Sequence, residues 1–479
     1  MAGLGAVAAV DLGASSGRVV LGRVGPDTLE LTTLHRFPNE PMMLDDGLHW
    51  DILGLYAHVL QGLRLALAEE PDLLGFAVDS WAVDYALLRD GELLGAPYHY
   101  RDERTGRGVA AVHAVIDHAG LFARNGLQFL PFNTVYQLAT EGERLAEADS
   151  FLMVPDLFAY WLTGERTVEL TNASTTGLVR SGSAAWDTDL LVRLGLPSRI
   201  LPPLVAAGTT IGKLTPEVAA SLGAAHGLVV TSVGSHDTAS AVVGVPMAAD
   251  AAYVSCGTWA LVGVEISSPL LTPEARTAGF TNEAGVDGRT RFLHNVMGLW
   301  LLSESIRDWE AQGLPADLPT LLAEAAAVVT PVPVFDTDDA RFLPPGEMVS
   351  RIAGACADAG QPVPGSPAET VRVILESLAA AFAVTVAKAA RLTGQPVSVV
   401  HVVGGGSQNS LLCQLTADRT GLPVLAGPVE ATAIGNVLVQ ARQHGLISGS
   451  LEDLRALVAR THPPTRYEPR LAATDKDPR

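Results

Sequence analysis

The sequence predicts an α/β protein built from two lobes of similar plan, and three observations support this prediction. Strand-like and helix-like stretches alternate along most of the 479 residues, which is typical of a mixed or parallel sheet covered by helices on both faces. A strand–turn–strand pattern at residues 6–22 recurs at residues 252–264, which indicates that the second half of the chain duplicates the first. A junction at residues 242–252 then gives an N-terminal lobe of residues 1–245 and a C-terminal lobe of residues 246–462.

The individual elements follow from the spacing of apolar residues. Val7 to Val10 is expected to be a buried strand, and residues 53–69 place their apolar side chains near one helical face. An apolar strand is expected at residues 74–78. In the second half, residues 371–392 form a long Ala-rich helix that leads into a strand at residues 397–403. The tail, residues 463–479, is polar and rich in Pro, so it is expected to be mobile.

Composition narrows the class of protein. The chain is 48% hydrophobic and 18% charged, as expected for a globular protein with a large core, and no apolar run reaches the length needed to cross a bilayer. A net charge of −20 without a clustered basic surface argues against a nucleic-acid partner. The first ten residues lack the basic start of a signal peptide. The three cysteines have no metal-ligand spacing, so they are expected to be reduced thiols in a cytoplasmic protein. The sequence leaves the oligomeric state open between a monomer and a small homo-oligomer.

The most informative turn follows the apolar run at residues 228–233. It reads Gly-Ser-His-Asp-Thr-Ala-Ser-Ala over residues 234–241 and delivers the carboxylate of Asp237 to the start of a small-residue helix. A carboxylate held at a strand end can accept a proton from a substrate hydroxyl. The alternative is that Asp237 only caps the helix.

A second turn, residues 11–18, joins the two strands of the first hairpin. Its small residues expose backbone N–H groups, and its hydroxyls add donors, which suits phosphate oxygens. Arg18 adds a positive charge. Since Asp11 would repel a phosphate, a cation between them is indicated, with Mg²⁺ held by Asp11 through water. A plain hairpin turn is the alternative reading.

Two turns of the second half carry the same kind of signal. Residues 255–258 can hold the far end of a triphosphate, unless they form only a hairpin. Gly404, Gly405 and Gly406 offer a flat backbone surface on which a nucleoside could lie, and three successive glycines are entropically costly for a purely structural turn.

Several polar residues are candidate sugar contacts. Trp81 and Asp84 follow a strand, and tryptophan faces stack on sugar rings. Asn295 is a short amide between apolar residues and needs a partner, which is a ligand hydroxyl or a core group. His236 can donate to a sugar oxygen or bond the backbone. Other motifs fail: residues 208–214 lack the Ser or Thr of a P-loop, and the consecutive residues 235–237 cannot adopt the geometry of a hydrolytic triad.

Taken in order, these turns resemble those of the FGGY family of carbohydrate kinases over about residues 6–445. The resemblance rests on stretches at residues 10–20, 100–105, 128–134, 235–241, 295–302, 403–409 and 426–431. It implies the duplicated actin/hexokinase-like (ribonuclease H-like) ATPase fold, with a cleft between the lobes. Within the family the chain is most similar to members that use ATP and Mg²⁺ to phosphorylate L-rhamnulose at its 1-hydroxyl.

The resemblance also implies roles for single residues. The resemblance implies that Asp237 occupies the position of the family's proton acceptor. The nucleotide contacts it implies are Ala14, Ser15, Ser16, Gly17, Arg18, Thr258, Gly404 and Gly405. The sugar contacts it implies are His236, Asp237, Thr238 and Asn295.

Two positions depart from the family pattern. Ala82 stands where the family often has a Gly that contacts the sugar through its backbone, and Ser303 stands where a Gln reaches the nucleotide. The first departure bears on the sugar range and the second on one ATP contact.

Other functions remain open at this point. A kinase of the same family acting on L-fuculose or xylulose has the same turns. An actin-like ATPase or a sugar sensor would bind without transferring. An acyl hydrolase is disfavoured because the triad geometry fails.

Overall fold

The computed structural model describes residues 3–224, 227–329 and 331–470, which divide into two compact units. Unit 1 consists of residues 1–246, 265–292 and 431–461, and unit 2 of residues 247–264, 293–430 and 462–479. The units are therefore not two continuous halves, because two later segments return to unit 1. The predicted lobes, 1–245 and 246–462, assign residues 265–292 and 431–461 to the second lobe, whereas these segments belong to unit 1.

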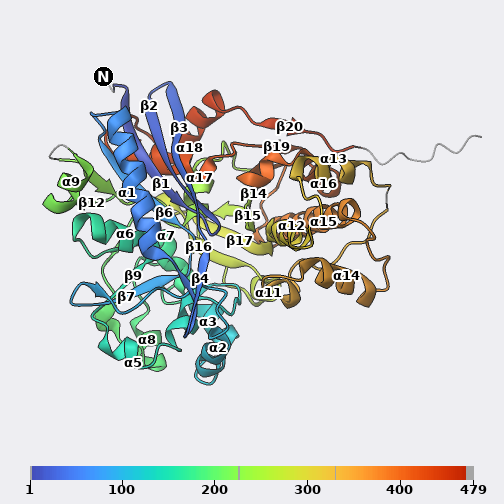
Figure 1. Cartoon of the computed structure of the whole chain (residues 1–479), viewed down its shortest axis with the longest axis horizontal. Helices are drawn as coiled ribbons and strands as arrows, with labels where there is room; N and C mark the ends of the chain where they lie inside the picture. Colours follow the sequence, from blue (N-terminus) through green and yellow to red (C-terminus); the bar gives the residue numbers. More distant parts are fainter. Residues whose placement is uncertain (1–2, 225–226, 330, 471–479) are drawn as a thin grey trace, which may run out of the picture. The chain divides into compact units, whose positions relative to one another are not determined.

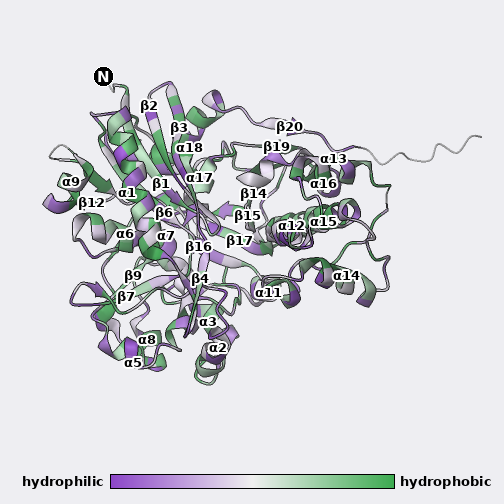
Figure 2. Cartoon of the chain, in the orientation of Figure 1, coloured by the Kyte–Doolittle hydropathy of each residue, from purple (hydrophilic) through white to green (hydrophobic). Residues whose placement is uncertain are grey.

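The main sheet of unit 1 has the strand order β12-β13-β6-β1-β2-β3. Strand β1 (Gly5–Leu12) pairs antiparallel with β2 (Ser16–Gly25) and parallel with β6 (Gly75–Ser80), and β6 pairs parallel with β13 (Val229–Thr231). The outer strands are β3 (Thr28–Pro38) and β12 (Thr210–Lys213). β3, at one edge, carries hydrophilic residues among hydrophobic ones (Figure 2).

Helices cover both faces of this sheet, as predicted. Successive side chains of a strand point to opposite faces, and two positions of β2 of opposite parity meet different helices. Val19 contacts Gly62 of α1 (Ile52–Glu69), whereas Gly22 faces Val437 of α17 (Ala431–Gln443). α1 and α17 therefore lie on opposite faces (Figure 1). Buried residues of β1, β2, β6 and α17 share one core cluster, which explains why the late segment 431–461 belongs to unit 1.

The central strands of unit 2 repeat this topology. β14 (Ala251–Cys256) pairs antiparallel with β15 (Trp259–Ile266) and parallel with β18 (Val399–Val403), and β18 pairs parallel with β19 (Val424–Ala426). The order β15-β14-β18-β19 thus corresponds to β2-β1-β6-β13 of unit 1. The predicted α/β duplication is confirmed at the level of strand order and direction.

Two expectations about the second half need correction. α15 (Pro367–Thr393) is long and apolar enough by length and composition to cross a membrane, contrary to the expectation that no run is; yet 61% of its most apolar window is buried in the fold, as in a core helix. The predicted mobile tail contains β20 (Thr465–Tyr467), which pairs antiparallel with β19 because backbone pairing does not depend on apolar side chains. Residues 471–479 of that tail lie outside the described residues.

The remaining elements complete the two units. The other strands and helices of unit 1 are β4 (Pro41–Leu44), β5 (Gly47–Trp50), β7 (Tyr85–Arg89), β8 (Glu92–Leu93), β9 (Ser150–Met153), β10 (Val168–Glu169), β11 (Leu204–Val205), β16 (Thr281–Ala284), α2 (Thr105–His113), α3 (His118–Asn125), α4 (Thr134–Leu138), α5 (Glu143–Glu147), α6 (Val154–Thr163), α7 (Leu170–Ala173), α8 (Thr188–Leu194), α9 (Pro216–Leu222), α10 (Asp237–Val243), α11 (Pro273–Thr277) and α18 (Leu451–Thr461). Those of unit 2 are α12 (Trp300–Ala311), α13 (Leu318–Ala327), α14 (Met348–Asp358) and α16 (Ser410–Thr420), and β17 (Thr290–Met297) begins in unit 1 and ends in unit 2.

Candidate active site

Asp237 is the first residue of α10, directly after the strand end that the sequence predicted. The capping position belongs to His236, whose side chain makes no cap hydrogen bond, so Asp237 is not the helix cap. Its carboxylate is 29% exposed, and the hydroxyl of Thr238 donates to Oδ1 at 3.0 Å. α10 is held against α17 by a close approach: a Cβ on Gly435 would lie 2.6 Å from the carbonyl carbon of Ser240. A carboxylate in this position is oriented and still accessible.

Two further carboxylates act on Asp237. Asp11 and Asp79 are register partners on the parallel strands β1 and β6. Burial raises the pKa of Asp79 well above its usual range, and the charges of Asp11 and Asp237 raise it further, against a hydrogen bond from Asn436. Burial also raises the pKa of Asp237, with Asp11 adding to the effect and His236 and Thr238 opposing it. Three acids within electrostatic reach make this end of the sheet a place where a cation is favoured.

Asp79 was not among the residues predicted from the sequence. It is fully buried, accepts a hydrogen bond from Asn436 Nδ2 at 2.5 Å, and its Oδ1 has no hydrogen-bond partner. The signal that could have found it is its place at the end of an apolar strand, the rule that identified the other turns.

Arg18 is committed to Asp11. The two residues are register partners across β1 and β2, and Nε and Nη2 of Arg18 lie 2.8 and 2.6 Å from Oδ2 of Asp11. The positive charge predicted to face a phosphate is thus shared with this carboxylate. In the turn between them, Ser15 and Ser16 are exposed and Ala14 is half-buried, while Asn39 Nδ2 donates to the carbonyl of Gly13 at 2.8 Å.

A buried ion pair supports His236 from behind. Arg291 Nη2 lies 3.0 Å from Glu283 Oε2 and donates to Nδ1 of His236 at 3.1 Å. Nδ1 of His236 also lies 3.3 Å from Oε2 of Glu283, so it is placed between a guanidinium donor and a carboxylate acceptor, while Nε2 lies 3.5 Å from Asp237 Oδ1. Burial alone would raise the pKa of Glu283, but Arg291 and His236 outweigh it and hold that pKa below its usual range. This pair was not predictable from the sequence, because its members are about 50 residues from His236.

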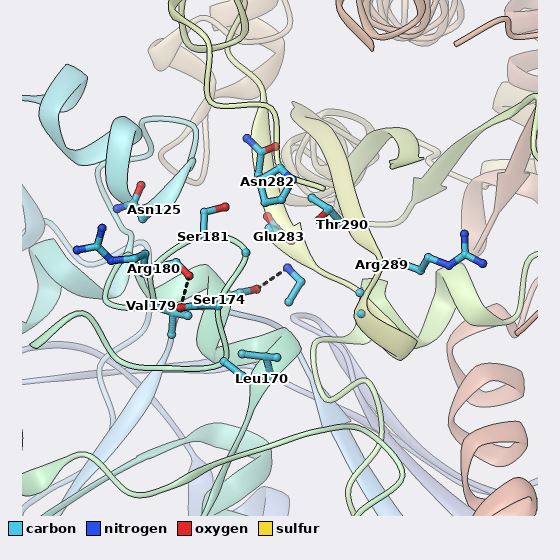
Figure 3. A pocket seen from close by; sticks show the side chains of 17 residues that line it. Asn125, Leu170, Ser174, Val179, Arg180, Ser181, Asn282, Glu283, Arg289 and Thr290 are labelled. Carbon is cyan, nitrogen blue, oxygen red and sulfur yellow. Dashed lines mark hydrogen bonds between the residues drawn. The ribbon is translucent and has the colours of Figure 1, made fainter. Parts of the chain in front are cut away.

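A cavity of about 220 Å³ adjoins this ion pair in unit 1 (Figure 3). Glu283 lines it, and Ala284 N donates to Ser174 Oγ at 2.9 Å across its wall. The cavity therefore borders the Arg291–Glu283 ion pair that contacts His236. Its other polar lining residues include Asn125, Ser181, Asn282 and Thr290.

Trp81 and Asp84 do not offer the sugar contacts predicted for them. The ring centroid of Trp81 lies 4.0 Å from that of Trp50, and its Nε1 donates to Asp84 Oδ2 at 3.0 Å, so the indole is packed in the core. Asp84 is fully buried. Their packing partners come from distant segments, which sequence spacing does not reveal. Ala82, between them, is half-buried.

The nucleotide residues predicted in the second half come together within unit 2. Leu299 N and Trp300 N donate to the carbonyls of Gly257 and Thr258 at 2.9 and 3.1 Å, which fixes the hairpin turn against the start of α12. Ser303 is exposed on the first turn of that helix. Asn295 lies on β17 and is half-buried.

The glycine turn after β18 packs on the end of β14. A Cβ on Gly406 would lie 2.5 Å from Cys256 Cβ, so this glycine has a structural reason, and Gly404 has a positive φ of 76°. Gly405 is exposed and has no such constraint, which leaves its face open to a ligand. Burial raises the pKa of Cys256 to about 12, with Cys413 adding to it, so Cys256 is not a nucleophile.

The structure thus gathers the predicted residues into one group in each unit. Unit 1 brings Asp11, the turn at residues 14–18, Ala82 and residues 236–238 to the ends of β1, β2, β6 and β13. Within it, Ser80 N donates to Ser235 O at 2.9 Å and Trp81 N to Leu12 O at 3.1 Å. Unit 2 holds Thr258, Asn295, Ser303, Gly404 and Gly405.

Comparison with known proteins assigns both parts of the chain. The N-terminal domain of the FGGY family of carbohydrate kinases matches residues 7–244, and the C-terminal domain of that family matches residues 252–444. A rhamnulokinase of Pectobacterium carotovorum is 43% identical over 474 residues, covering 97% of this chain and 93% of the relative. A rhamnulokinase of Bacteroides thetaiotaomicron is 38% identical over 474 residues, covering 98% and 96%.

Solved structures share the fold. A xylulose kinase from Rhodospirillum rubrum superimposes with a TM-score of 0.76 at 21% identity, covering 97% of this chain and 94% of that one. A gluconate kinase from Lactobacillus acidophilus gives a TM-score of 0.79 at 14% identity, covering 98% and 94%. With the repeated strand order of the two units, these matches confirm the predicted duplicated α/β ATPase-type fold. The chain belongs to the FGGY family of carbohydrate kinases.

Proposed function

We propose that the chain is an ATP-dependent kinase that transfers the γ-phosphoryl group of ATP to the 1-hydroxyl of L-rhamnulose. Membership of the family and the identity of 43% to a rhamnulokinase over 97% of the chain support the reaction class and the sugar. The observation that carries the mechanism is Asp237, an accessible carboxylate at a strand end, oriented by Thr238 and faced by Nε2 of His236.

Asp237 acts as the proton acceptor. The sugar oxygen attacks the γ-phosphorus, the bond from that phosphorus to the bridging oxygen of ADP breaks, and the hydroxyl proton passes to Asp237. Most of the remaining task is positioning, because phosphoryl transfer requires little covalent chemistry from the protein. The backbone at Ala82, the His236 ring, Thr238 and Asn295 are the proposed sugar contacts.

The proposed ATP contacts are the exposed backbone of the two hairpin turns and the glycine turn. They comprise Ala14, Ser15, Ser16, Gly17, Arg18, Thr258, Ser303, Gly404 and Gly405. Oxygens of the triphosphate are suited to the N–H groups of such turns, and the open face of Gly405 suits a nucleoside.

A magnesium ion fits this arrangement only through water. Among the residues that the structure describes, no three His, Cys, Asp or Glu side chains are grouped to hold a metal directly, and Oδ2 of Asp11 is taken by Arg18. We propose Asp11 as an outer ligand, since the carboxylates of Asp11, Asp79 and Asp237 together favour a cation. When bound with ATP, Mg²⁺ neutralises charge on the phosphates.

Release of ADP in the presence of different ketoses, with and without Mg²⁺, tests the proposal. L-Rhamnulose is expected to give the highest kcat/KM, and chelation of the metal is expected to abolish turnover. Higher kcat/KM for L-fuculose or xylulose would assign another ketose kinase of the family, an alternative that the methyl group of Ala82 keeps open. ATP binding without sugar-dependent ADP release would favour a sensor.

Replacement of Asp237 by Asn tests the proton acceptor. The amide keeps the size of the side chain but cannot take the proton, so kcat should fall by roughly 10²–10⁴-fold. Nucleotide binding, measured by calorimetry, should be retained because Asp237 is not a proposed ATP contact. Near-normal turnover in this variant would contradict the assignment. A cytoplasmic location, where ATP is available, belongs to the same proposal.

A further inference from the structure

The turn that joins β6 to β7, residues 81–84, holds a strained backbone. Val83 has a φ of 67°, in the left-handed region that a β-branched side chain strongly disfavours. Asp84 N donates to the carbonyl of Ala82 at 2.9 Å, so the turn is tight. Such a conformation persists only where the surrounding structure imposes it.

Asp84 supplies the main restraint. It is fully buried, and its two carboxylate oxygens accept four hydrogen bonds. Three of these bonds go to Oδ2 and one to Oδ1, so both oxygens are engaged within the fold. Oδ2 accepts from Nε1 of Trp50 at 2.7 Å, Nε1 of Trp81 at 3.0 Å and N of Tyr100 at 3.2 Å, and Oδ1 accepts from Nε2 of Gln137 at 2.9 Å.

The amide of Gln137 cannot turn over. Arg104 Nη2 donates to its Oε1 at 3.1 Å, and its Nε2 donates to the carbonyl of Phe132 at 2.9 Å as well as to Asp84. If the amide were reversed, its NH₂ group would face the donor Arg104 Nη2, and its oxygen would face the acceptors of Asp84 and Phe132. Thr134 Oγ1 adds a bond of 2.6 Å to the carbonyl of Val83.

Three stretches of the sequence therefore converge on this turn. Residues 100–105 contribute Tyr100 and Arg104, residues 128–134 contribute Phe132 and Thr134, and the turn itself follows β6. The first two stretches carried part of the family resemblance but contain none of the proposed sugar or ATP contacts. Their side chains and carbonyls instead fix the shape of the turn.

The turn is attached to the candidate site on its other side. Ser80 N donates to the carbonyl of Ser235, and Ser80 forms a parallel bridge with His236. Trp81, Val83 and Asp84 are buried, and Ala82 is the residue of the turn that is only half-buried. The buried restraints thus decide where the backbone of Ala82 is presented beside His236.

We propose that Val83 and Asp84 are positioning residues for the sugar: the Asp84 carboxylate, held by four hydrogen bonds, locks Val83 in its left-handed conformation and thereby sets the backbone of Ala82 for the sugar hydroxyls. This inference rests on the proposed function, since it takes Ala82 as a sugar contact. It explains why a β-branched residue occupies a position that glycine would take without strain. A pre-set turn spends no binding free energy on ordering itself when the sugar arrives.

Asp84→Asn is the first test. The amide oxygen must take the place of Oδ2 to receive three donors, so the new NH₂ faces Nε2 of Gln137, which cannot reverse. The KM for L-rhamnulose should rise roughly tenfold to a hundredfold, while the KM for ATP stays within about twofold. The matched control is Asp187→Asn, which breaks another buried carboxylate of unit 1, bound by Arg124 at 2.7 and 2.8 Å, away from the turn. It should lower the thermal midpoint and leave the sugar KM unchanged.

Val83→Gly is the second test, and it remains informative if Asp84→Asn fails to fold. Glycine adopts a φ of 67° without strain, and this relief opposes the loss of the buried Val83 side chain, so the thermal midpoint should fall by less than it does for a core valine in a β conformation. The sugar KM should nevertheless rise, because the turn is no longer confined to one conformation. A sugar KM equal to that of the wild type in either variant would overturn the proposal.

Failure of the proposed function would look different. If the wild-type protein phosphorylates no ketose, the kinase assignment fails. The effect of Asp84 on the turn is then tested by a crystal structure of the Asp84→Asn protein. If Val83 keeps its positive φ and Ala82 keeps its position in that variant, the proposed role of Asp84 is overturned. A turn at residues 81–84 in which Val83 has left the left-handed region would support the role of Asp84 independently of sugar binding.

Discussion

Replacement of Arg291 by Met is expected to destabilise unit 1 strongly. Arg291 has no exposed surface and Glu283 is 5% exposed, so the change leaves a carboxylate buried without its counter-charge. The same change removes the donor to Nδ1 of His236 and the bond from Nε to the carbonyl of Ala284 at 3.0 Å.

The magnitude follows from the distance between the charges. At 3.0 Å, two unit charges attract each other by about 5–6 kcal/mol at an effective dielectric constant of about 20. In the intact pair, the cost of desolvating both groups offsets much of this attraction. Once Arg291 is replaced, Glu283 keeps its full desolvation cost without the attraction. The expected loss is therefore about 3–5 kcal/mol, the range for breaking one side of a buried pair. Turnover should also fall, since His236 loses one of the two contacts that hold its ring at Nδ1.

Urea unfolding followed by tryptophan fluorescence measures the loss, with Arg289→Met as the control. Arg289 lies two residues away, and its pair with Glu452 is exposed on both sides, so that change should alter stability by less than about 1 kcal/mol. Arg291→Lys keeps a positive charge and should recover part of the stability. A loss below about 1 kcal/mol in Arg291→Met would refute the reasoning that the pair neutralises a buried charge.

Three further predictions concern buried groups. Burial raises the pKa of Asp84 from 3.8 to about 6, against hydrogen bonds from Gln137 and both indoles, so the folded state holds this proton more tightly; the associated stability is complete below pH 3.8 and is lost as pH rises through 6. The difference in unfolding free energy between the wild type and Asp84→Asn should thus shrink by about 2 kcal/mol between pH 4 and 7, and a difference independent of pH would contradict it. Gly406→Ala should cost about 1–3 kcal/mol in urea unfolding through overlap with Cys256, and adding Cys256→Ala should restore part of it, whereas no loss would show that the turn moves freely. All three thiols are buried, so a thiol reagent at pH 8 should modify them only upon unfolding, and rapid labelling of Cys256 in the native protein would be the contrary result.

Local elements were predictable because their signals are local. The helix expected at residues 53–69 is α1, Ile52–Glu69, capped by Asp51, and the strand expected at residues 7–10 lies within β1. Apolar spacing reports these elements directly, since one face of each must be buried. The placement of Asp237 after a strand followed from the same rule, as did the repeated hairpin that revealed the duplication.

Pairings between distant segments were not predictable. Trp81 was assigned to the sugar because an indole after a strand has two possible partners, and only the fold shows that Trp50 and Asp84 take it into the core. The return of residues 265–292 and 431–461 to unit 1 is equally invisible to periodicity, because an amphipathic helix such as α17 does not specify which sheet it covers.

The chemistry of Asp237 is set by the residues that the sequence concealed. The turn Gly-Ser-His-Asp-Thr places a carboxylate and an imidazole side by side, but neither the tautomer of the ring nor the electrostatic surroundings of the acid are encoded in it. Arg291 and Glu283 contact Nδ1 of the ring, so that Nε2 faces Asp237, and Asp11 and Asp79 oppose the ionisation of Asp237. The proposed proton acceptor therefore lies among like charges, which stabilise its proton-bound form after transfer. In the proposed mechanism, a cation held near Asp11 would favour the ionised form of Asp237, which is the form that accepts the proton.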